Sequence, residues 1–61
     1  MKNLTIAESI KRSSDPHHAA VVAFSRQEYT PNSGSKTYFF EDGSYLVFAI
    51  TYTAAETGVS A

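Results

Sequence analysis

The stretch TYFFEDGSYLVFAITYT, residues 37–53, decides the fold that this chain can adopt. It contains six of the eight aromatic residues in a chain of 61. Its two apolar arms flank a short polar segment, residues 41–44, and an Asp-Gly pair between apolar arms is a strong signal for a β-hairpin. We therefore expect two antiparallel strands that turn at Gly43.

The length of the turn decides which side chains share a face of this hairpin. A three-residue loop, with Gly43 in the left-handed conformation, pairs Phe40 with Ser44 and places the even-numbered residues of both arms on one face. We prefer this register because it separates large apolar side chains from mixed ones, and a one-residue slip would exchange the faces. The predicted core face consists of Tyr38, Phe40, Leu46, Phe48, Ile50 and Tyr52.

The odd-numbered residues then form an outer face. Phe39 and Tyr45 lie directly opposite each other, and such a pair can serve simply to stabilise an exposed sheet. Contiguous exposed aromatic side chains also mark contact surfaces, and this hairpin places few charges on that face. We therefore predict a protein-binding surface made of Phe39, Tyr45 and Val47, with Thr37 and Thr51 at its rim.

Two segments precede the hairpin. Residues 3–12 carry an apolar stripe at helical spacing, and we expect a helix with Asn3 as N-cap and no capping box at Thr5. Residues 16–29 begin like a helix, with Asp15 as N-cap and Pro16 in the first turn. Their apolar residues also alternate as in a strand, so both interpretations stay open and helix is slightly favoured.

The predicted fold class is α+β. One or two short N-terminal helices pack on an antiparallel β-hairpin, or one helix packs on a three-stranded antiparallel meander if residues 16–29 are a strand. Residues 30–36, TPNSGSK, have the composition of a loop. We expect a single domain over residues 1–53 and a flexible C-terminal tail over residues 54–61, AAETGVSA, which is small and polar.

Composition argues against several classes of function. A net charge of −1 is neither the basic excess of a dedicated nucleic-acid binder nor the acidity of a DNA mimic. The chain has no cysteine, which removes disulfides and thiolate metal sites and fits a cytoplasmic location. No run approaches the roughly 18 apolar residues of a membrane span, so we expect no membrane association.

Catalytic and metal-binding patterns are weak. Asp15, His17 and His18 are ligand types, but adjacent residues on a helix point about 100° apart, and we expect a cap and two solvated histidines instead. Turn chemistry explains the carboxylates Glu41 and Asp42. A chain this short has little room for a ligand pocket of about 300 Å³ or more. We expect no enzymatic activity, no metal and no cofactor.

The leading hypothesis is a small non-enzymatic interaction or regulatory protein that docks on a larger protein or on its own copy. The short length of the chain and its lack of a specific motif are typical of inhibitors and accessory factors from phages and mobile elements. A small core without disulfides also favours a homodimer, for which we expect contacts along residues 45–53, through the edge or the outer face of this segment.

The alternative is a small nucleic-acid-binding transcriptional regulator that dimerises through its C-terminal strand. If both N-terminal segments are helices, the order helix–helix–hairpin resembles that of small phage repressors that dimerise through a terminal strand. Base readout usually needs several Arg, Asn, Gln or Lys side chains on one helix, and the second segment has a single basic residue. The candidate contacts are Lys11, Arg12 and Arg26.

Overall fold

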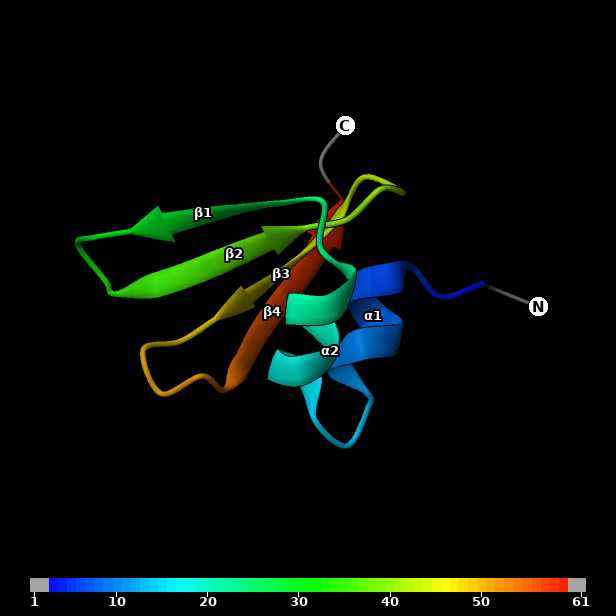
Figure 1. The fold of residues 1–61 in the computed structure, drawn as a ribbon, viewed down its shortest axis with the longest axis horizontal. Helices are drawn as coiled ribbons and strands as arrows, with labels where there is room; N and C mark the ends of the chain where they lie inside the picture. Colours follow the sequence, from blue (N-terminus) through cyan, green and yellow to red (C-terminus); the bar gives the residue numbers. More distant parts are fainter. Residues whose placement is uncertain (1–2, 60–61) are drawn as a thin grey trace.

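Two short helices are followed by a four-stranded antiparallel sheet in a computed structural model that describes residues 3–59 (Figure 1). The strand order β1-β2-β3-β4 places each strand beside its neighbour in the chain. The predicted α+β class is therefore confirmed, and the meander has more strands than either expected arrangement. The elements are α1 (Ile6–Lys11), α2 (Pro16–Ala23), β1 (Arg26–Thr30), β2 (Ser35–Phe39), β3 (Ser44–Phe48) and β4 (Ala54–Val59).

The ambiguous segment 16–29 contains a helix and a strand in succession. Asp15 caps α2 by accepting a hydrogen bond from the backbone N–H of His18 at 3.2 Å, and Pro16 opens the helix as expected. Phe24 then adopts an extended backbone, with ψ of 149°. The N–H of Ser25 donates to the carbonyl of Phe39 at 2.8 Å, which starts β1 beside β2. The helix interpretation was therefore right for residues 16–23 and the strand interpretation for residues 26–29.

The C-terminal residues 54–59 form β4, so the expectation of a flexible tail was wrong over this range. Residues 60–61 of that predicted tail lie outside the described residues. The physical reason is that β3 would otherwise be an open sheet edge with unpaired backbone groups. Pairing with β4 satisfies that edge from Ser44 opposite Val59 to Phe48 opposite Ala54.

The predicted hairpin register is confirmed between β2 and β3. Phe39 lies opposite Tyr45 and Tyr38 opposite Leu46. The N–H of Phe40 donates to the carbonyl of Ser44 at 2.9 Å. Gly43 has φ of +86°, the left-handed conformation that the three-residue loop requires and that glycine adopts without steric cost.

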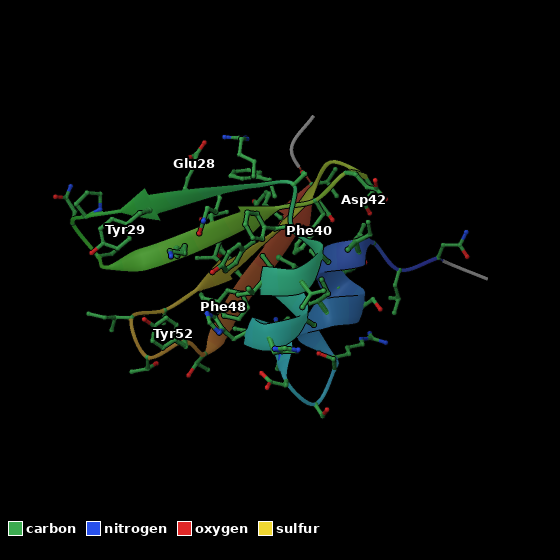
Figure 2. The ribbon with its side chains drawn as sticks, viewed as in Figure 1. Glu28, Tyr29, Phe40, Asp42, Phe48 and Tyr52 are labelled. Atoms are coloured by element: carbon green, nitrogen blue, oxygen red, sulfur yellow. The ribbon has the colours of Figure 1, made fainter. Side chains whose placement is uncertain are left out.

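The core lies between the even-numbered face of the sheet and the two helices. Figure 2 labels Phe40 and Phe48 on this side. The buried apolar residues are Ala7, Ile10, Ala20, Tyr38, Phe40, Leu46 and Phe48. Ile50 and Tyr52 were wrongly assigned to this core, because β3 ends at Phe48 and the chain turns before β4. Their side chains are 70% and 65% exposed.

The first turn of α1 is capped partly by hydrogen bonds between Thr5, which precedes the helix, and Glu8. Thr5 is the N-cap, and its hydroxyl accepts from the N–H of Glu8 at 3.2 Å, while the Glu8 carboxylate accepts from the N–H of Thr5 at 3.1 Å. This is the reciprocal capping box that the sequence analysis had excluded, so the assignment of Asn3 as N-cap was wrong.

The remaining donors of that turn are satisfied by the β2–β3 turn. The N–H of Ile6 donates to Asp42 Oδ2 at 2.9 Å, and the N–H of Ala7 donates to the hydroxyl of Ser44 at 3.1 Å. Ser44 is fully buried, and its N–H and hydroxyl both donate to Asp42 Oδ1. These hydrogen bonds stabilise the carboxylate, led by the one from the Ser44 side chain, and hold the pKa of Asp42 below its ordinary value of 3.8.

The two faces of the sheet should respond differently to the same substitution. Phe48→Ser removes a fully buried ring and leaves a hydroxyl in its place, so we expect a loss of about 3–5 kcal/mol in the free energy of unfolding. Phe39→Ser, on the half-buried outer face, should cost only about 1 kcal/mol. Urea denaturation measures both. Equal losses, or a larger loss for Phe39→Ser, would contradict this assignment of faces.

Candidate functional site

Within residues 3–59, the helices cover one face of the sheet and leave the other open (Figure 1). The open face carries the odd-numbered side chains of β2 and β3. Phe39 and Tyr45 form a ring pair with centroids 5.9 Å apart. Both side chains are half-buried, as are those of Thr37 and Val47 beside them. The structure thus brings together four of the five residues that were predicted to bind a protein.

Tyr45 lies across β4 rather than standing free. A Cβ atom added to Gly58 would come within 2.3 Å of the Tyr45 hydroxyl and 2.5 Å of its ring. Gly58 is the residue opposite Tyr45 in the sheet, so the missing side chain leaves room for the ring. The aromatic surface therefore continues from β2 over β3 to β4.

The open face is more charged than the hairpin sequence indicates. The guanidinium carbon of Arg26 lies 4.0 Å from the centroid of the Phe39 ring, and Arg26 also forms an ion pair with Glu28. On the other side, Glu56 lies opposite Val47. These charges come from β1, which lies at the end of the ambiguous segment, and from β4, which was expected to be a flexible tail. The expectation of a face with few charges was therefore wrong.

Thr51 does not belong to this surface. It lies in the turn between β3 and β4, where its hydroxyl is 3.1 Å from that of Thr53. Thr37 lies between Glu28 and Val47 in the sheet register and is central rather than peripheral. We define the outer-face patch as Thr37, Phe39, Tyr45 and Val47, bordered by Arg26, Glu28 and Glu56.

The three basic residues considered for nucleic-acid binding are divided between the two faces. Lys11 is the last residue of α1 and Arg12 its C-cap, so both lie with the helical layer. Arg26 is on the outer face, where Phe39 and Glu28 engage its guanidinium. No continuous basic surface joins these three side chains, because the sheet separates them.

His17 is packed, contrary to the expectation that both histidines are solvated. Its ring centroid lies 5.4 Å from that of Phe48 and 4.7 Å from that of Tyr52. His18 is exposed, and Asp15 serves as the helix cap. In the chain from residue 3 to 59, no group of three or more His, Cys, Asp or Glu side chains could hold a metal ion.

A cavity of about 300 Å³ opens on the helix side of the sheet, beyond the start of α2. Its floor is formed by Tyr38 and Phe48, and His17, Tyr29 and Tyr52 stand around it. From the sequence we expected little room for a pocket of this size, and this expectation was wrong. The room arises because the β1–β2 hairpin and the β3–β4 turn extend past the helices, as Figure 2 shows for Tyr29 and Tyr52.

The β3–β4 turn has the same hydrogen bonds as the β2–β3 turn. The N–H of Ala49 donates to the carbonyl of Thr53 at 3.0 Å, and the N–H of Tyr52 donates to the carbonyl of Ala49 at 2.8 Å. Tyr52 takes the place that Gly43 has in the first turn, with φ of +63°. A left-handed tyrosine costs on the order of 1–2 kcal/mol, and such strained residues often accompany functional sites.

Comparison with protein-family models, curated proteins and solved structures finds no match for this chain. Among the helices of residues 3–59, none has the length and apolar character needed to cross a membrane.

Relief of the strain at Tyr52 should stabilise the protein. Tyr52→Asn keeps the left-handed turn with a residue that tolerates it, so we expect the free energy of unfolding to rise by about 0.5–1 kcal/mol despite the lost ring contact with His17. Thr51→Asn is the matched control, because Thr51 does not have a positive φ. Urea denaturation of both variants measures the difference. Lower stability in Tyr52→Asn than in Thr51→Asn would show that the Tyr52 ring stabilises the fold by more than its backbone costs.

Proposed function

We propose that this chain is a small non-enzymatic interaction protein that docks on another protein through the outer-face patch. The observation that carries the proposal is the ring pair of Phe39 and Tyr45, centroids 5.9 Å apart, on a sheet face that neither helix covers. Core packing does not need these rings, because the buried cluster is built from the opposite face.

The chemistry of the patch fits a protein partner. Aromatic residues and arginine are enriched at the centres of protein interfaces, and Arg26 stacks on Phe39 at 4.0 Å. Arg26 already has Glu28 as a partner, so covering this charge would not leave it uncompensated. The complementary surface would present apolar side chains to the rings and a basic group to Glu56.

The partner can be a larger protein or a second copy of this chain. Of the two routes expected for a homodimer along residues 45–53, the edge of β3 is not open, because β3 pairs with β2 on one side and with β4 on the other. A second copy would therefore bind through the outer-face patch, by sheet-on-sheet packing. We favour the larger protein, since the border of the patch carries two carboxylates against one guanidinium and copies would oppose like charges.

The test uses Phe39→Thr with Tyr45→Thr, which removes both rings and keeps β propensity. A photo-crosslinking residue at position 37 should capture one protein in cells of the source organism. The double variant should fold normally and lower capture at least tenfold, the equivalent of about 1.4 kcal/mol. Sedimentation of the purified protein at micromolar concentration shows whether the captured protein is a second copy.

The control places the same crosslinker at position 22, because Val22 is 72% exposed on α2 in the helical layer. It should not capture that protein. Equal capture with and without the two rings, or capture from position 22 alone, would contradict the assignment of the patch. A salt series on the captured complex adds a second check, since nucleic-acid affinity falls steeply with salt and apolar docking does not.

A further inference from the structure

The cavity beside α2 lies on the helix-covered face of the sheet, opposite the outer-face patch. Its volume of about 300 Å³ is at the lower end of the range for small-molecule sites. Its floor is fixed, because Tyr38 and Phe48 are almost completely buried, at 3% and 1% exposure. Its rim is open, because Tyr29 and Tyr52 are 61% and 65% exposed.

The walls present aromatic faces to any occupant. Three of the four tyrosines in the chain line this cavity, together with Phe48 and His17. The rings of His17, Phe48 and Tyr38 already contact one another edge to face, with the Tyr38 and Phe48 centroids 5.5 Å apart. A flat aromatic molecule could stack against the exposed rings of the rim in the offset or edge-to-face geometry that aromatic pairs prefer.

The charge of the side chains that line the cavity favours a ligand with a negative charge. Among residues 3–59, Lys36 is the one Lys or Arg side chain that lines the cavity, and no Asp or Glu of this range lines it. Its ammonium lies 6.0 Å from the centroid of the Tyr38 ring. Lys36 forms no ion pair among residues 3–59, whereas Arg26 on the outer face does. A half-buried cation without a counter-ion, at the wall of an aromatic cavity, provides a partner for an anionic group.

The backbone at Tyr52 supplies an independent observation. The equivalent position of the other hairpin is Gly43, which adopts the left-handed conformation at no cost. A tyrosine there is unfavourable for folding, and its side chain is two-thirds exposed, so burial does not compensate. The ring instead stands against His17 at the mouth of the cavity, with centroids 4.7 Å apart.

We propose that this cavity binds a small planar aromatic molecule that carries a negative charge. The aromatic ring would stack against Tyr52 and Tyr29 above the floor of Tyr38 and Phe48, and the anionic group would reach Lys36. Two sources share this chemistry, aromatic carboxylates and mononucleotides, and the test separates them.

The test is an NMR titration of the full chain with matched probes. Indole-3-acetate is compared with neutral indole and cationic tryptamine, and adenosine monophosphate with adenosine. The anion of at least one series should bind at least tenfold more tightly than its neutral analogue, a difference of about 1.4 kcal/mol, and should shift the resonances of His17, Lys36 and Tyr52. The series with the tighter anion identifies the source.

Three variants locate the site. Lys36→Gln should abolish the preference for the anion while leaving the neutral probe unaffected. Tyr52→Asn should weaken both probes, although it stabilises the fold. Phe39→Thr with Tyr45→Thr should change neither affinity, so that failure of this proposal and failure of the docking function are distinguishable.

Several outcomes would overturn the proposal. These are no binding of either anion at millimolar concentration, equal affinity for the anion and its neutral analogue, and shifts confined to residues outside the cavity. A single-stranded oligonucleotide that binds more than tenfold more tightly than the mononucleotide would also overturn it, because the site would then be part of a nucleic-acid surface.

Discussion

The hydrogen bonds from the first turn of α1 to Asp42 and Ser44 connect the two layers of this protein. A helix of six residues is far below the roughly 12–15 residues that an isolated helix needs in water. Its early amides are nevertheless all satisfied, those of Ile6 and Ala7 by the β2–β3 turn and that of Glu8 by Thr5. The polar segment 41–44 between the aromatic arms is thus both a turn of the sheet and a cap for α1. The capped residues Ile6 and Ala7 are 36 and 37 residues away from their partners in the sequence.

This connection places the helices and thereby defines both candidate surfaces. Because α1 is fixed at the β2–β3 turn, the helical layer covers that end of one sheet face (Figure 1). The β1–β2 hairpin and the β3–β4 turn extend beyond it, and the aromatic cavity lies there. The opposite sheet face stays uncovered within residues 3–59 and carries the Phe39–Tyr45 pair. The protein can therefore present two unrelated surfaces with a single small core.

Sequence reasoning predicted the parts of the fold that have strong local signals. The Asp-Gly turn predicted the register of β2 and β3 correctly, and Asp15 with Pro16 predicted the start of α2. The strand β4, AAETGV, escaped prediction and β1, RQEYT, was only one of two open interpretations, because both are polar or small and form by pairing with the edges of the central hairpin. The capping box was available in the sequence, since Glu8 follows Thr5 by three residues, and was missed.

The outer-face patch followed from the register, whereas the cavity could not be predicted. Its walls come from four separate elements, and its mouth depends on a turn with a left-handed tyrosine. Local rules expect glycine at such a position, so Tyr52 was assigned to a continuing strand.

The most direct test of the connection between α1 and the β2–β3 turn follows the amide proton of Ile6 by NMR while the pH falls from about 7 to 2. The pKa of Asp42 is lowered in the folded state, so its stabilising contribution is complete above the ordinary value of 3.8 and is lost as the pH falls through the lower folded value. We expect the Ile6 amide to shift with a midpoint below 3.8, in step with that of Ser44, and Asp42→Asn to abolish this shift. An Ile6 amide that stays constant while Ser44 titrates would show that Asp42 caps only its own turn and does not hold the helix.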